Sequence, residues 1–165
     1  MESDEKEFLE RNIKHRYYVS FFLMKLIEDL FLRSNVHDVS KHSDEEFEGF
    51  RKSIYYLKGP WGQENRPPEI LEQLNESLQI HYKRNDHHPE HFENGMEDMD
   101  LVQLLELIAD WRAAMIGQDN HDIDETIATG QERFGYPDFM AKILKNTLIK
   151  IRQYELEADM HLPSL

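Results

Sequence analysis

Apolar residues recur along most of this chain at spacings of three and four, which places them on one face of an α-helix. The first such segment runs from about Glu5 to Arg33 without a glycine or proline to interrupt it. Later segments begin at residues typical of helix starts, such as Ser43, Pro68 and Asp100. The pattern predicts five to six helices, over residues of about 5–33, 43–57, 68–88, 100–115, 122–134 and 136–157.

Signals for other fold classes are missing from the sequence. No β-hairpin pattern and no internal repeat occurs. Without strands or a glycine-rich loop, a doubly wound sheet and the usual nucleotide-phosphate loops are excluded. A chain of 165 residues is long enough for one core. We therefore expect an all-α, single-domain helical bundle spanning residues 1–165.

The composition limits which partners the protein is expected to bind and in which compartment it is expected. The formal net charge is −14, and Lys and Arg are scattered, so extended nucleic acid is not expected to bind. A small anionic substrate is still compatible, because a divalent metal reverses the local field of an acidic site. The acidic start of the chain does not resemble a signal peptide, and no apolar run is long enough to span a membrane. The expected compartment is the cytoplasm, with no membrane partner.

Residues 81–91 hold four of the nine histidines in the chain. Imidazole is the commonest neutral metal ligand in proteins. With no cysteine present, any metal site must use nitrogen and oxygen ligands, which suits Mn, Fe, Co, Ni, Zn or Mg. We expect distant residues to join the cluster around one or two divalent ions. The candidates are His15, His37, Asp38, His81, His87, His88 and Asp110.

Several of these residues have a purely structural interpretation as well. His15 lies on an apolar helix face, where a buried core histidine is a common occurrence. Asp110 is either solvated or buried against a cation. Glu45 and Glu46 follow Ser43, and we interpret them as residues that stabilise a helix start rather than as catalytic groups. Arg84 is either a solvated residue at a helix end or a phosphate ligand.

Three local motifs resemble the HD superfamily of metal-dependent phosphohydrolases. His37-Asp38-Val39-Ser40-Lys41 resembles its His-Asp-hydrophobic-small-Lys motif, and residues 108–115 are similar to the helix that carries its last aspartate. Residues 87–90, His-His-Pro-Glu, resemble the stretch found in the binuclear branch. More narrowly, the combination resembles a family of small bacterial and phage proteins of unknown function.

This resemblance implies an HD-like fold, with a metal-site core at about residues 8–117 and C-terminal helices at 121–158. It implies that Lys41 contacts the phosphate of a substrate. Asp38 is then both a ligand and a proton acceptor, and Arg84 is a second candidate for the phosphate. The implied ligands of a first metal are His15, His37, Asp38 and Asp110, and that of a second is His87 or His88, with His81 as a further candidate.

The expected function is hydrolysis of a small phosphorylated molecule, such as a nucleotide, by a metal-activated water. An alternative follows from helical relatives that hold two irons, which is a di-iron oxygenase. A third alternative is a protein that binds a partner, in which a metal only holds the helices together. A closed metal site, with every position filled by side chains, would favour the third.

Overall fold

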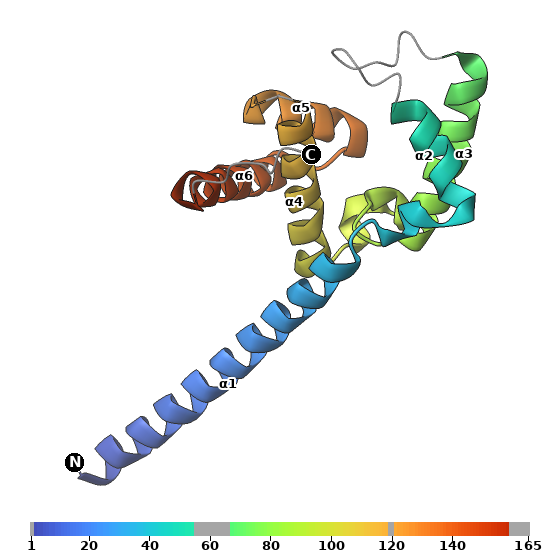
Figure 1. The fold of residues 1–165 in the computed structure, drawn as a ribbon. Coiled ribbons are helices and arrows are strands. Elements are labelled where there is room, and N and C mark those ends of the chain that lie inside the picture. The colour runs from blue at the N-terminus through green and yellow to red at the C-terminus, as the bar shows by residue number, and fades with distance from the viewer. Residues whose placement is uncertain (1, 55–66, 119–120, 159–165) are drawn as a thin grey trace. The chain divides into compact units, whose positions relative to one another are not determined.

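The computed structural model describes residues 2–54, 67–118 and 121–158. These residues form six α-helices and three short 3-10 helices, and none of them forms a strand (Figure 1). The all-α prediction is therefore confirmed. The end of the second predicted helix, at residues 55–57, and the connection to Pro68 lie outside the described residues.

Residues 1–37 form one compact unit, and residues 38–165 form another. The first unit consists of one long helix, α1 (Glu2–Val36), which confirms the first predicted helix. Tyr18, Leu23 and Met24 point in three different directions from its axis, and all three are exposed. A helical stretch with apolar side chains on several sides is typical of one that is covered by other protein surfaces. The prediction that the whole chain is one domain stays a prediction.

In the second unit, helices α2 (Asp44–Ile54) and α3 (Pro68–Arg84) pack side by side. Gly49 makes this contact possible, because a Cβ atom there would lie 2.2 Å from Ser77 Oγ and 2.6 Å from the carbonyl oxygen of Gln73. Glu46 lies one turn before Gly49, and His81 lies one turn after Ser77. The close approach therefore brings Glu46 and His81 to facing positions.

Short irregular segments lead into and out of this helix pair. Asp38 has a left-handed backbone, with φ 59°, and precedes the 3-10 helix η1 (Val39–His42). After α3, His88 is extended, with φ −97° and ψ 131°, as the following Pro89 requires. The helices η3 (Pro89–His91) and η4 (Gly95–Asp98) then carry the chain to α4.

The last three helices form the main hydrophobic core. They are α4 (Leu101–Gly117), α5 (Ile123–Phe134) and α6 (Asp138–Ala158). The Asp100 carboxylate caps α4, and Gln103 completes a capping box. The fully buried side chains at the centre of the core are Leu107, Leu144 and Leu148.

A second close approach joins α4 to α5. A Cβ atom at Gly130 would lie 2.8 Å from the indole of Trp111 and 2.7 Å from the hydroxyl of Tyr136. That hydroxyl donates a 2.7 Å hydrogen bond to the carbonyl of Ile127. Burial raises the pKa of Tyr136 to about 12, so the phenol stays a donor at neutral pH. Gly130 thus fixes the distance between the two helices.

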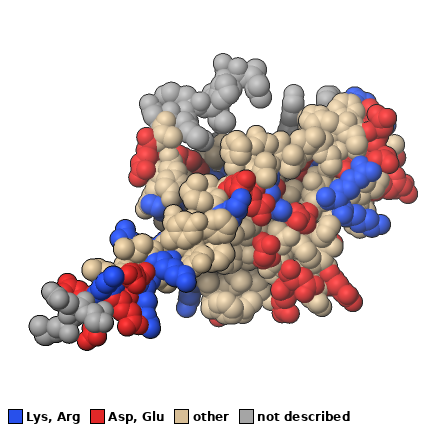
Figure 2. Space-filling model, turned by 90° about the horizontal axis from the view of Figure 1, so that it is seen from below, with Lys and Arg blue, Asp and Glu red and all other residues tan. Residues whose placement is uncertain are grey.

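The described helices and their surface charges concern two kinds of partner that the sequence does not predict, membranes and extended nucleic acid. No described helix is both long and apolar enough to cross a membrane. On the face shown in Figure 2, Lys and Arg are interspersed with Asp and Glu. The exclusion of extended nucleic acid stays a prediction.

A buried ion pair joins α4 to α6 and provides a test of the fold. Arg112 is 4 % exposed, and its Nε and a terminal nitrogen lie 2.5 and 2.6 Å from the two carboxylate oxygens of Glu155. Glu155→Ala leaves the guanidinium buried without this partner, and we expect a loss of about 3 kcal/mol in the free energy of unfolding. Urea denaturation followed by circular dichroism measures the loss.

The control is Glu157→Ala, on an exposed position of the same helix. We expect it to change the free energy of unfolding by less than about 0.5 kcal/mol. Equal effects of the two substitutions would show that the Arg112 pair does not hold α6 in place.

Candidate metal centre

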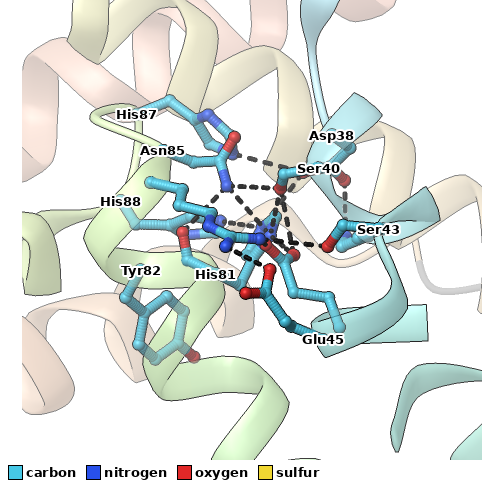
Figure 3. Close-up of polar contacts among 12 residues, drawn as sticks. Asp38, Ser40, Ser43, Glu45, His81, Tyr82, Asn85, His87 and His88 are labelled. Atoms are coloured by element: carbon cyan, nitrogen blue, oxygen red, sulfur yellow. Dashed lines mark hydrogen bonds and ion pairs between the residues drawn. The ribbon is translucent and has the colours of Figure 1, made fainter. Parts of the chain in front are cut away.

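Four side chains of the second unit converge on one point (Figure 3). One atom from each of Asp38, His81, His87 and His88 lies within 4.8 Å of the other three. His81 Nε2 lies 3.0 Å from His88 Nε2 and 3.1 Å from Asp38 Oδ1, which is itself 3.6 Å from His87 Nε2. Neighbouring atoms bound to one metal at about 2.1 Å are roughly 3.0–3.4 Å apart. The observed spacing therefore suits a single ion.

The local backbone explains why these residues meet. His81 lies in the last turn of α3, and Asn85 ends that helix with its side-chain amide bonded to the carbonyl of His81 at 2.8 Å. Its amide also donates to Ser40 Oγ at 2.8 Å, which ties the end of α3 to η1. The extended backbone at His88, imposed by Pro89, turns the double histidine back over His81.

Asp38 presents its two carboxylate oxygens to different partners. Oδ1 faces the imidazoles, whereas Oδ2 accepts a 2.5 Å hydrogen bond from Lys41 Nζ. Aspartate is one of the few residues that tolerate a left-handed backbone, so the φ of 59° costs little here. Lys41 balances the carboxylate charge and leaves Oδ1 directed at the centre.

Glu46 lies behind His81 and is 0 % exposed. Its Oε2 is 2.8 Å from His81 Nδ1 and accepts a 3.0 Å hydrogen bond from Ser40 Oγ. Its other oxygen accepts a 3.2 Å hydrogen bond from Arg84. A carboxylate beside Nδ1 favours the tautomer with the proton on that nitrogen, which directs the lone pair of Nε2 toward Asp38 and His88.

His87 has the same arrangement with a second carboxylate. Its Nδ1 lies 3.3 Å from Glu106 Oε1, on α4, while its Nε2 faces Asp38. Such carboxylate–histidine pairs are usual behind histidines that bind metals, because they fix the ring and raise its basicity. Two of the three imidazoles are therefore held in the orientation that a ligand needs.

The third imidazole is held in the neutral form. Burial, together with the nearby rings of His87 and His81, lowers the pKa of His88 to about 3. The charge of Asp110 acts in the opposite direction, which places this carboxylate in the electrostatic environment of the centre. A neutral imidazole is the protonation state that binds metals.

The structure thus brings together four of the seven predicted ligands, with Asp110 close to them. Lys41 contacts Asp38, as described above. Arg84 forms ion pairs with Glu45 and Glu46 and donates to Ser43 Oγ at 3.0 Å. His15 and His37 belong to the first unit, and their participation stays a prediction.

Sequence analysis missed the two carboxylates behind the histidines. Glu46 was interpreted as a residue that stabilises the start of α2, but its carboxylate is buried against His81. The burial follows from tertiary packing, because Glu46 lies one turn before Gly49 on the face that packs closely on α3. Glu106 lies one turn before Asp110, so both acidic residues share a face of α4.

Comparison with known proteins identifies the family without naming an activity. No curated protein matches the chain, and no solved structure matches it. A family model does match residues 4–154, and its description is a family of unknown function, DUF5662. The resemblance to the HD superfamily stays a resemblance. Because the match covers nearly the whole sequence, the chain belongs to this family of unknown function.

Proposed function

We propose that this protein is a divalent-metal-dependent hydrolase that acts on a small phosphorylated molecule, such as a nucleotide. The observation that carries the proposal is the convergence of Asp38, His81, His87 and His88 on one point, with Glu46 and Glu106 behind two of the rings. Structural ion pairs do not need three imidazoles in mutual contact. A shared metal ion explains why three rings and one carboxylate turn toward each other.

The donor set bears on which metal would bind. Three imidazoles and a carboxylate suit Mn, Fe, Co, Ni or Zn better than Mg, which prefers oxygen ligands. Four side chains fill the positions of a tetrahedral zinc ion, whereas a metal with five or six positions keeps one or two open for water and substrate. Hydrolysis therefore favours Mn, Fe, Co or Ni at this centre.

A bound divalent ion lowers the pKa of a coordinated water and polarises a phosphoryl oxygen. The protein would supply the remaining groups. Asp38 Oδ1 is directed at the centre and would hold the ion, and Oδ2, which accepts a hydrogen bond from Lys41, is the oxygen of this carboxylate that is left to take up a proton. Lys41 Nζ lies 2.5 Å from Asp38 Oδ2 and is partly exposed, which suits it to a substrate phosphate.

Arg84 has a different role in this proposal. Its guanidinium is held by Glu45 and Glu46, and the Glu46 contact continues to His81. We propose that Arg84 positions the buried carboxylate of Glu46. Its sequence-based role as a phosphate ligand stays a prediction.

A second candidate function is supported by the same four ligands. If the resident metal is zinc, a tetrahedral site would be closed, and the ion would hold η1 to the end of α3 without catalysis. The remaining alternative, a di-iron oxygenase, requires two ions in each chain. The identity and number of the bound metals separate these three functions.

The first test is elemental analysis of protein that is purified without a histidine tag. We expect about one Mn, Fe, Co or Ni ion for each chain, since the ligand spacing suits a single ion. His87→Ala combined with His88→Ala should remove it. The control is His91→Ala, an exposed histidine of the same segment, which should keep the metal. No metal in the wild type, even after addition of these ions, would contradict the proposal.

A second test examines the buried carboxylate. Glu46→Gln keeps the size of the side chain but weakens the hydrogen bond that orients His81, and we expect the metal affinity to fall about 10- to 100-fold. Competition with a chromophoric chelator measures the affinity. Glu45→Gln is the matched control, because Glu45 contacts Arg84 but is exposed. If both variants bind metal equally well, Glu46 does not orient a ligand.

A third test addresses catalysis. Manganese-loaded protein should release phosphate from nucleoside monophosphates or from glycerol phosphate. Asp38→Asn should lower kcat by about 100-fold or more, because the amide cannot accept the proton and is also a weaker metal ligand than the carboxylate. Phosphate release is measured colorimetrically. If the wild type binds the metal but hydrolyses none of these esters, the second candidate function is favoured, in which the ion only holds η1 to the end of α3.

A further inference from the structure

A cavity of about 230 Å³ lies between α4 and α5, apart from the four candidate ligands. The side chains of Trp111, Met115 and Phe134 form its apolar walls. Gln118, Glu125 and Thr129 contribute an amide, a carboxylate and a hydroxyl to its rim. The cavity thus combines aromatic walls with several hydrogen-bonding groups.

The shape of the cavity depends on the close approach of the two helices. The rings of Trp111 and Phe134 are nearly parallel, at 14°, with centroids 6.1 Å apart. Gly130 lies against Trp111, where any larger residue would displace the indole. The Arg133 guanidinium covers the Phe134 ring at 4.8 Å and holds it in position. The walls are therefore flat and fixed.

Two side chains, Arg133 and Tyr82, connect this cavity to the candidate metal centre. Arg133, which lines the cavity, donates a 3.2 Å hydrogen bond to the hydroxyl of Tyr82 and is paired with Glu90. The Tyr82 ring lies 5.0 Å from the ring of His88. A continuous series of contacts, from Arg133 through Tyr82 to His88, therefore runs from the cavity to the centre.

We propose that this cavity binds the base of a nucleotide whose phosphate lies at the metal centre; the inference rests on the proposed function. Flat aromatic walls favour a planar ring, because stacking acts on the face of every nucleobase. The carboxylate of Glu125 accepts hydrogen bonds from amino groups, and Gln118 and Thr129 both donate and accept. Pockets for whole ligands usually measure about 300–1,000 Å³. The smaller volume here suits one ring system.

The test uses nucleosides, which carry no phosphate, in the presence of EDTA. Trp61→Phe leaves Trp111 as the single tryptophan of the chain. Adenosine, guanosine, cytidine and uridine are titrated separately, and the fluorescence of Trp111 is excited at wavelengths that the bases do not absorb. We expect saturable quenching by at least one nucleoside.

In the same background, Thr129→Phe fills the cavity and should weaken this binding about tenfold or more, the equivalent of one lost base stack. Ala128→Phe is the matched control, because it adds the same ring one position earlier, outside the cavity, and should leave the binding unchanged. Thermal melting establishes that both variants fold.

Two results would overturn the inference. One is the absence of saturable quenching by all four nucleosides, and the other is quenching that Thr129→Phe does not weaken. Since neither measurement involves metal or hydrolysis, such a failure leaves the proposed hydrolase untouched. Conversely, a protein that binds nucleosides but holds no metal would refute the hydrolase and keep the cavity as a binding site.

Discussion

The hydrogen bond between Glu46 and His81 is the interaction on which the candidate metal centre depends. A carboxylate without solvent exposure is costly unless other groups compensate its charge. Glu46 receives this compensation from the imidazole, from the Ser40 hydroxyl and from the Arg84 guanidinium. These partners come from η1 and from the C-terminal end of α3. The buried carboxylate of Glu46 thus connects α2, η1 and α3, and it also orients the imidazole of His81.

This interaction also constrains the packing of the helices around it. The carboxylate reaches His81 only because α2 and α3 touch at Gly49, where no side chain separates the two backbones. A similar contact at Gly130 sets the distance between α4 and α5. In both places the absence of a Cβ atom allows functional side chains on neighbouring turns to meet. Small residues at helix contacts are therefore as important to the two proposed sites as the polar residues.

The helices were predictable from the sequence, because apolar periodicity and end residues such as Pro68 and Asp100 are local signals. The histidine cluster was also predictable, since a group of imidazoles with no cysteine indicates nitrogen and oxygen ligands, and Asp38 was singled out by its resemblance to the His-Asp motif. The carboxylates behind the rings were not. Glu46 has the sequence context of an ordinary helix start, and only its position relative to α3 shows that it is buried. Such a role depends on tertiary packing, which has no local signal.

The contact at Gly49 has a consequence for the thermodynamics of ion binding. In many small metal proteins the ligands are brought together by the ion itself, so much of the binding free energy is spent on folding. Here backbone packing and a buried hydrogen bond already hold three imidazoles and a carboxylate at ligand distances. Little conformational entropy would then be lost when an ion enters. Under the proposed function such a centre would be preorganised, and its selectivity among metals would depend on how firmly the four side chains are held.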